Sequence, residues 1–315
     1  MKALVTGAAG FIGSHLASAL LDRDAQVVGI DCFTDYYPRA IKEANVRTLA
    51  GRAGFTLIES AIQDADLPRL LDGITHVFHL AAQAGVRKSW GQDFRVYTVQ
   101  NIEATQCLLE ALVGRPIERF VYASSSSVYG DHVPLPTSES ARLHPFSPYG
   151  VTKLAAEQLA ALYHGNYGVP AVSLRYFTVY GPRQRPDMGF HRFLRAAQQG
   201  DPITVYGDGE QTRDFTFVSD AVAATLAAGT RGRPGQVYNV GGGSRVTVNH
   251  VVDLIARIAD RRLQIRREPA QKGDMRHTYA DTSLARQELG FVPLVPLDEG
   301  LERQYRWFQQ TPALA

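Results

Sequence analysis

The chain has 315 residues and a formal net charge of +2, with 45% hydrophobic and 20% charged residues, the composition of an ordinary globular protein. A charge so close to zero gives no electrostatic reason to expect binding to nucleic acid or to a membrane surface, and no apolar run reaches membrane-spanning length. Its 2 cysteines are too few for a disulfide framework or a cysteine-based metal site, so we expect a reducing, cytoplasmic compartment.

Short apolar runs alternate with helical patterns along the first 180 residues. The first run, Lys2–Thr6, precedes a glycine-rich turn and a helix expected over Phe11–Leu21. Further strands are expected at Gln26–Asp31, Thr56–Ser60, His76–Ala81, Arg119–Ser124 and Ala171–Arg175, and long helices at Phe94–Leu112 and Pro148–Tyr167. This alternation predicts an α/β protein with a Rossmann-type, doubly wound parallel sheet that is covered on both faces.

The glycine-rich turn contains Gly7, Gly10 and Gly13. In such a turn the first glycine permits the tight bend, the second lets the backbone approach a pyrophosphate, and the third lets the helix pack closely on the strand. The helix N-terminus then presents free N–H groups to the phosphates. Asp31 ends the second expected strand, where a carboxylate accepts hydrogen bonds from the adenosine ribose and repels a 2′-phosphate. Arg39, eight residues later, is a poor candidate for offsetting that repulsion, so the predicted cofactor is NAD.

Tyr149 and Lys153 lie four residues apart in an expected helix and therefore share one face. A free tyrosine has a pKa near ~10, but a lysine ammonium and an oxidised nicotinamide ring nearby both favour the phenolate. We predict that Tyr149 is the base that takes an alcohol proton while a hydride leaves the same carbon. The serine cluster 124–127 follows an expected strand and places hydroxyl groups at the carboxyl edge of the sheet, where ligands bind.

The composition of the sequence and the length of its expected elements change after Tyr180. Polar, turn-prone loops appear at 181–187, 207–210 and 241–244, and the expected strands and helices become shorter. We therefore predict an NAD-binding domain over residues 1–179 and a smaller C-terminal α/β substrate domain over 180–315. A segment near 210–240 is expected to cross back to the larger sheet.

With these motifs the chain resembles, over nearly its full length, the extended short-chain dehydrogenase/reductase superfamily, in its NAD-dependent nucleotide-sugar epimerase and dehydratase branch. The resemblance implies that Ser125 hydrogen-bonds the reacting oxygen. It also implies that adenine contacts the backbone at Ile62, since Ala61 stands where the family often has an acid. The residues implied at the cofactor, beside Tyr149 and Lys153, are Gly7, Gly10, Phe11, Ile12, Gly13, Asp31, Ile62, Leu80, Ala81, Ala82, Asn101 and Tyr176.

Three groups of relatives share this apparatus, and the serine segment separates them. Sugar 4,6-dehydratases need an Asp-Glu pair where this chain has Ser126 and Ser127, and UDP-glucuronate decarboxylases typically carry glutamate at the position of Ser127. Both departures favour 4-epimerisation, in which C4 is oxidised, the keto sugar turns over, and the hydride returns to the other face.

Two segments are similar to those of UDP-glucuronate 4-epimerases: Gly29–Tyr37, and Leu174–Pro182 followed by Arg185-Pro-Asp-Met188. UDP-galactose 4-epimerases usually show asparagine at the position of Thr178. The resemblance therefore implies conversion of UDP-glucuronate to UDP-galacturonate. The residues expected at the substrate are Arg87, Ser125, Ser126, Ser127, Thr178, Arg185, Val205, Tyr206, Arg213, Asp274 and Arg276.

These substrate residues have different expected tasks. The hydroxyls of the serine segment and Thr178 would bond the sugar carboxylate, and Arg185 would bind or orient it, unless Arg185 only pairs with Asp187 within its loop. Arg213 and Arg276 would bind the diphosphate. Asp274 would hold the uridine ribose, Arg87 would contact the substrate, and either Tyr206 or Val205 would line the uracil slot.

Several alternatives stay open at the level of sequence. The chain could be a UDP-galactose/UDP-glucose 4-epimerase, a UDP-glucuronate decarboxylase, or a non-catalytic NAD-binding regulatory protein. No metal is expected, since His79, His144 and His191 lack metal-ligand spacing. The family resemblance implies a homodimer in which the helices at 94–112 and 148–167 of two subunits form a four-helix interface.

Overall fold

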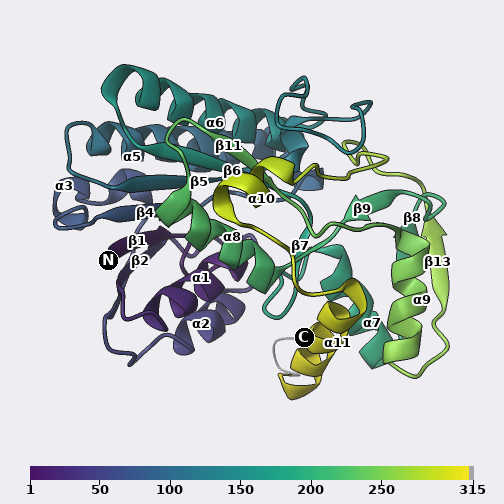
Figure 1. Cartoon of the computed structure of the whole chain (residues 1–315). Helices are drawn as coiled ribbons and strands as arrows, with labels where there is room; N and C mark the ends of the chain where they lie inside the picture. The colour runs from purple at the N-terminus through teal and green to yellow at the C-terminus, as the bar shows by residue number, and fades with distance from the viewer. Residues whose placement is uncertain (312–315) are drawn as a thin grey trace.

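The structure, a computed structural model, describes residues 1–311 (Figure 1). Its central sheet has seven parallel strands in the order β11-β6-β5-β4-β1-β2-β3. These strands are β1 (Lys2–Thr6), β2 (Gln26–Asp31), β3 (Phe55–Glu59), β4 (His76–His79), β5 (Arg119–Ser125), β6 (Ala171–Tyr176) and β11 (Val237–Val240). The strand order reverses between β1 and β4, the position at which doubly wound sheets bind ligands. The predicted Rossmann-like α/β fold class is confirmed.

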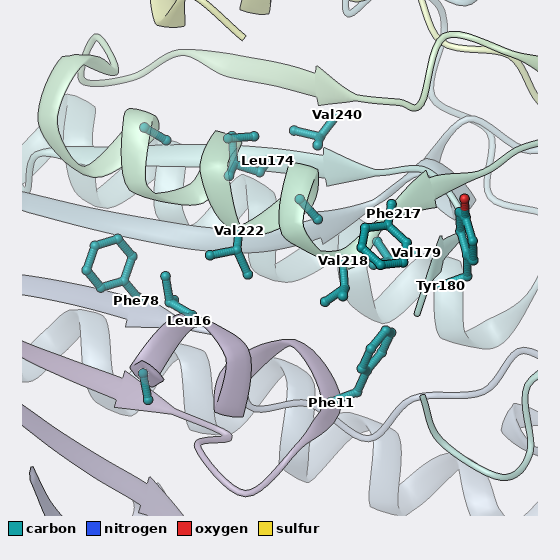
Figure 2. Close-up of a cluster of buried hydrophobic side chains, with 14 of the residues drawn as sticks. Phe11, Leu16, Phe78, Leu174, Val179, Tyr180, Phe217, Val218, Val222 and Val240 are labelled. Atoms are coloured by element: carbon teal, nitrogen blue, oxygen red, sulfur yellow. The ribbon is translucent and has the colours of Figure 1, made fainter. Parts of the chain in front are cut away.

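Helices cover both faces of this sheet. α5 (Ala104–Leu112) and α6 (Pro148–Tyr167) lie on one face, and α1 (Phe11–Leu21) and α8 (Val218–Arg231) lie on the other (Figure 1). Neighbouring strand residues alternate between the two layers, as with Phe78 on the α1/α8 side and Val77 on the α5/α6 side. Figure 2 shows part of the α1/α8 side, where side chains of these two helices pack against those of the sheet. Burial on both faces explains the nearly continuous apolar strands.

The helix expected over Phe94–Leu112 is interrupted. It divides into α4 (Phe94–Tyr97), a π-helical turn (Thr98–Glu103) and α5. The π-helical turn contains Asn101, which is buried and uses its side-chain amide for bonds outside the helix. Such bulges are frequent at functional sites.

The second half of the chain forms three two-stranded sheets and several helices beside the large sheet. The strand pairs are β7 (Val179–Tyr180) with β10 (Thr216–Phe217), β9 (Thr212–Asp214) with β12 (Arg245–Thr247), and β8 (Ile203–Tyr206) with β13 (Ile265–Glu268). The helices are α7 (Gly189–Gln199), α9 (Val248–Ile258), α10 (Ser283–Leu289) and α11 (Leu297–Gln310), while α2 (Arg39–Arg47) and α3 (Leu67–Leu70) belong to the first half. Two elements of the second half belong with the large sheet: β11 is its edge strand, and α8 packs on one of its faces. Within residues 1–311, no helix combines the length and apolar character needed to cross a membrane.

Candidate active site

The glycine turn connects β1 to α1 with very little space around its backbone. Gly7 has a φ of 70°, and a Cβ on Gly13 would lie 2.1 Å from the Gly7 carbonyl oxygen. Gly7 N–H donates to the Ile30 carbonyl over 2.8 Å, which ties the turn to the end of β2. In the described part of the chain no side chain caps Gly10 at the start of α1. The N–H groups of the first helical turn are therefore available to an anionic ligand such as a pyrophosphate.

Asp31 lies at the end of β2, beside this turn. Its Oδ2 accepts from Ala9 N–H (3.1 Å) and its Oδ1 accepts from Phe33 N–H (2.9 Å). Lys42 Nζ lies 4.0 Å from Oδ1. These contacts fix a carboxylate at the sheet edge, and each oxygen keeps a lone pair for a ribose hydroxyl. The turn and Asp31 together fit a dinucleotide.

Asn101 joins the loop that follows β4 to helix α6. Its Oδ1 accepts from Gln83 N–H (2.7 Å), while its Nδ2 donates to the Gln83 carbonyl (3.0 Å) and to Thr152 Oγ1 (2.9 Å). The same loop contacts β1, since Ala81 N–H donates to Thr6 Oγ1 over 3.0 Å. Asn101 therefore positions the loop and α6 against each other, and its side chain does not line the cavity described below.

Tyr149 and Lys153 lie on the first two turns of α6, which begins where Ser147 Oγ accepts from Gly150 N–H (3.1 Å). Gly150 allows a close approach, because a Cβ there would lie 2.5 Å from the Ser127 carbonyl oxygen. This contact brings α6 against the 3-10 turn Ser126–Val128 at the end of β5. Ser125 and Tyr149 consequently face the same cavity, and Lys153 Nζ lies 4.4 Å from the centre of the Tyr122 ring.

Burial dominates the electrostatics of Tyr149 and Lys153 in the polypeptide. Burial raises the pKa of Tyr149, and the opposing effects of the Arg185 charge and the Ser125 hydroxyl do not fully offset it. Burial also lowers the pKa of Lys153 to about 7, against the opposing effect of Glu157. Desolvation of the phenolate therefore outweighs the neighbouring charges of the polypeptide. The expected acidity of Tyr149 includes the charge of an oxidised nicotinamide and stays a prediction.

A cavity of about 730 Å³ opens in front of this cluster, between the large sheet and the second half of the chain. From the cofactor side it is lined by Phe11, Ile12 and Tyr176, and from the reaction side by Ser125, Ser126, Ser127, Tyr149 and Thr178. From the second half, Arg185, Arg192, Tyr206, Arg213 and Asp274 line it. Its volume lies in the range of small-molecule binding pockets.

Arg185 is engaged by Asp187 inside the cavity. Its Nε donates to Asp187 Oδ1 (2.9 Å) and its Nη2 to Oδ2 (3.0 Å), while Tyr36 Oη also donates to Oδ2 (3.2 Å). Burial alone would raise the pKa of Asp187, but the Arg185 charge and these hydrogen bonds lower it, so the carboxylate stays ionised. The pair predicted as an alternative for Arg185 is thus present, and it leaves Nη1 for another partner.

The cationic residues expected at the diphosphate have different partners. Arg213 donates only to backbone carbonyls, those of Thr212 and Arg276, and makes no ion pair with another described residue. Arg276 is exposed and forms a bidentate pair with Asp208, both bonds being 2.7 Å. Arg87 pairs with Asp274 over 2.7 Å and stacks on Tyr206, with its guanidinium carbon 4.1 Å from the ring centre.

Of the two residues suggested for the uracil slot, only Tyr206 has its side chain at the cavity. Strand β8 places Thr204 and Tyr206 on the cavity side, whereas Val205 is 1% exposed and packs with Ile203 and Val252. The alternation of strand side chains therefore corrects the suggestion of Val205. Ile62 is likewise a buried core residue, which leaves its backbone for a ligand.

Three residues at or beside the site have no role in the sequence expectation. Tyr36 and Arg192 line the cavity, the latter with its guanidinium carbon 5.8 Å from the Tyr206 ring centre. Glu157 is 2% exposed and lies one helical turn beyond Lys153. The i,i+4 spacing from Lys153 is the one sequence signal that points to Glu157; no local pattern shows that Arg192 faces a cavity.

Three histidines were expected to hold no metal. His79 is buried and contacts Thr6 Oγ1 (2.7 Å) and Thr105 Oγ1 (2.9 Å) through its two ring nitrogens. Among the described residues, no cluster of three or more His, Cys, Asp or Glu side chains is arranged to hold a metal ion.

The chain is similar to known proteins over almost its whole length. The NAD dependent epimerase/dehydratase family model matches residues 3–241. An uncharacterized UDP-glucose epimerase of Bacillus subtilis strain 168, YtcB, is 46% identical over 96% of each chain. The UDP-glucuronate 4-epimerase of Thermodesulfobacterium geofontis strain OPF15 is 35% identical over 98% of this chain and 96% of the relative. The crystal structure of the Bacillus cereus UDP-glucuronic acid 4-epimerase, in complex with UDP-glucuronic acid and NAD, superposes with a TM-score of 0.96 at 44% identity, covering 98% of this chain and 99% of that one.

Proposed function

We propose that this chain, which belongs to the NAD dependent epimerase/dehydratase family, catalyses the NAD-dependent 4-epimerisation of a UDP-sugar, and that UDP-glucuronate is the substrate. The observation that carries the proposal is the convergence of Ser125, Tyr149 and Arg185 on one cavity. The first two residues suit oxidation of an alcohol, and the third suits a carboxylate on the same sugar.

The cofactor we propose is NAD, held by the glycine turn and Asp31. The free N–H groups of α1 suit the pyrophosphate, and the lack of space for a Cβ on Gly13 suits close approach of α1 to the turn. Lys153 and the loop Leu80–Ala82 would adjoin the nicotinamide half, and Ile62 the adenine. When bound there, the cofactor would supply hydride-transfer chemistry at C4.

Tyr149 is the proposed base. It accepts the proton of the C4 hydroxyl during oxidation and gives it back to the C4 oxygen during reduction, with Ser125 donating a hydrogen bond to that oxygen. Because burial raises the pKa of Tyr149, the phenolate needs positive charge in addition to Arg185. The Lys153 ammonium and the oxidised nicotinamide are the groups proposed to supply it.

The intermediate of this reaction, a 4-keto sugar with a carboxylate at C5, is a β-keto acid and loses carbon dioxide when the carboxylate bond aligns with the carbonyl π system. We propose that Arg185 Nη1 and the hydroxyls of Ser126, Ser127 and Thr178 hold the carboxylate out of that alignment while the ring turns over. Asp187 supports this role by fixing the plane of the guanidinium through two hydrogen bonds.

For the nucleotide part of the substrate, Arg213 is the strongest candidate. Its guanidinium lines the cavity without a carboxylate bonded to it, so a diphosphate would be its first charged partner. Arg276 and Arg87 would have to leave Asp208 and Asp274 to reach the same phosphates. Tyr206 would stack on uracil, and Asp274 would accept from the ribose.

The assembly we propose is a homodimer formed by α4, α5 and α6 of two subunits. Val151 and Leu162 lie on one side of α6 with 48% and 58% exposure, although both are apolar. We also propose a cytoplasmic location, since Cys32 and Cys107 are both free.

The experiment that tests the proposed function is product analysis by NMR, with UDP-glucuronate and UDP-glucose supplied separately to the purified protein and NAD. We expect UDP-galacturonate from the first and little turnover of the second. Arg185→His should release carbon dioxide and a 4-keto pentose product. Clean epimerisation by that variant would contradict the role of Arg185, and conversion of UDP-glucose alone would favour a UDP-glucose 4-epimerase, the activity in the name of the B. subtilis relative.

A further inference from the structure

The ends of β2 and β3 place two carboxylates side by side at the adenosine end of the site. The two strands pair in parallel with Asp31 opposite Glu59. Neighbouring strands lie about 4.8 Å apart, so the backbone of Glu59 is one strand spacing from that of Asp31, whose carboxylate would bind the ribose hydroxyls. A phosphate on the ribose 2′-oxygen would therefore meet both of these negative charges.

Arg39, at the first position of α2, is the cation that pairs with Glu59, while Lys42 lies beside Asp31. The Nη1 and Nη2 of Arg39 donate to the two oxygens of Glu59, each over 2.7 Å, and its Nε donates to Glu43 over 2.7 Å. Its guanidinium carbon lies 4.5 Å from the centre of the Phe33 ring. Phe33 in turn donates its N–H to Asp31 Oδ1, so one residue connects Arg39 to the ribose-binding carboxylate.

The charge balance around this point is unfavourable for a phosphate. Three carboxylates lie beside two cations here: Asp31, Glu43 and Glu59 beside Arg39 and Lys42. Both cations already have partners, since Arg39 pairs with Glu59 and Glu43, and Lys42 Nζ donates to the Thr34 carbonyl and hydroxyl. Arg39 has the planar, bidentate geometry that suits a phosphate as well as a carboxylate. In the structure its donors are directed at Glu59 and Glu43, so these carboxylates compete with any phosphate for its charge.

We propose that Arg39 is a latent 2′-phosphate-binding residue and that Glu59, acting with Asp31, masks it and so makes the chain select NAD over NADP. This rests on the proposed use of a nicotinamide dinucleotide. Glu59 and Arg39 are both about half exposed, with 51% and 50% of their side chains accessible, so a change at Glu59 alters charge with little effect on packing.

The test is a competition between the two dinucleotides, read without any turnover. Each protein is equilibrated with equal concentrations of NAD and NADP, washed by gel filtration, denatured, and analysed for bound nucleotide by mass spectrometry. Glu59→Gln should move the NADP:NAD ratio toward NADP by about tenfold, as expected for removal of one charge at this distance in a partly exposed site. Asp31→Asn/Glu59→Gln should bind mainly NADP.

A third substitution identifies the residue that binds the phosphate. Adding Arg39→Gln to the double variant should lower the NADP:NAD ratio by at least tenfold, because the Arg39 guanidinium is the proposed partner of the 2′-phosphate. Asp22→Asn is the matched control: it removes the carboxylate of another exposed pair, with Arg52, and should leave the ratio at the wild-type value. Asp22 lies at the C-terminal end of α1, whereas Asp31 contacts the turn at the N-terminal end of that helix.

The outcomes separate the two proposals. Wild-type protein that retains neither dinucleotide would contradict the proposed function. If the wild-type protein retains NAD, two results would contradict the role of Arg39 while leaving the epimerase proposal intact. One is an unchanged NADP:NAD ratio in Glu59→Gln and in the double variant. The other is a changed ratio that persists when Arg39→Gln is added.

Discussion

Single side chains at this site are tuned by burial as much as by their neighbours. Lys153 shows this most clearly, because it is 3% exposed and its pKa falls to about 7 through desolvation, against the opposing charge of Glu157. Glu157 is itself held by Arg175 through two bonds of 2.6 Å and 3.0 Å and accepts from Ser124 Oγ. A carboxylate on the same helix therefore helps to keep the ammonium that the Tyr149 phenolate requires.

Removal of the Glu157 charge should shift the pH dependence of the reaction. In Glu157→Gln the pKa of Lys153 drops further, so the ammonium is lost at lower pH and the alkaline limb of kcat against pH should move down by about one unit. The unpaired Arg175 should also cost about 3–5 kcal/mol of stability. The double variant Glu157→Gln/Arg175→Gln should regain part of the free energy of unfolding, while the alkaline limb of its kcat profile should stay at the lowered pH.

The same pH profile for Glu299→Gln provides the control, since Glu299 is exposed, pairs with Arg303 on α11 and does not line the cavity. A Glu157→Gln protein with lowered stability but an unmoved alkaline limb would show that Glu157 has a structural role alone.

Secondary-structure elements place the reacting groups through close backbone approaches. Gly13 is the clearest example, because a Cβ there would lie 2.1 Å from a backbone oxygen that has no room to move. Gly13→Ala should displace α1 from the turn, lower the free energy of unfolding by about 1–3 kcal/mol, and reduce the NAD retained on purification.

Gly165→Ala is the matched control for this substitution. Gly165 lies within α6 with no atom within 4 Å of its would-be Cβ, so alanine should stabilise the helix by about 0.5–1 kcal/mol and leave NAD content unchanged. Denaturant unfolding and the absorbance of released nucleotide measure both effects. A Gly13→Ala protein as stable and as NAD-rich as the wild type would refute the close-approach explanation.

Elements with strong local patterns could be predicted from the sequence. The glycine turn, the strand Lys2–Thr6 and the helix Pro148–Tyr167 lie at the predicted positions, because their apolar periodicity, Ser147 cap and C-terminal Gly168 are local signals. The π-helical turn around Asn101 could not be predicted, since it depends on amide bonds to Gln83 and Thr152, distant in sequence.

The site residues divide in the same way. Tyr149 and Lys153 were predicted from their spacing, and Ser125 from the family resemblance. The pairing of Arg39 with Glu59 and of Arg276 with Asp208 depends on partners 20 and 68 residues away. The direction in which the pKa of Tyr149 shifts in the polypeptide could not be predicted, because the free-energy cost of burying a phenolate depends on the packed structure and not on the residues adjacent in sequence.

Within the described residues, helix α6 exposes the apolar side chains of Val151 and Leu162. If α6 forms the proposed dimer interface, Leu162→Glu should place a charge in it and give monomers at micromolar concentration in light scattering. Leu294→Glu is the control, because Leu294 is more exposed, at 78%, but lies outside α4–α6, in the loop before α11. Monomeric wild-type protein, or an unchanged dimer in Leu162→Glu, would contradict the proposed interface.

Across the whole molecule, the sheet and the cavity serve one proposed reaction, in which a hydride leaves C4 and returns to the same carbon without exchange with water. Turnover of UDP-glucuronate carrying deuterium at C4 measures this most directly. We predict UDP-galacturonate that retains the deuterium at C4. Loss of the label to solvent, or incorporation of solvent hydrogen at C4, would contradict a hydride shuttle with Tyr149 as the base.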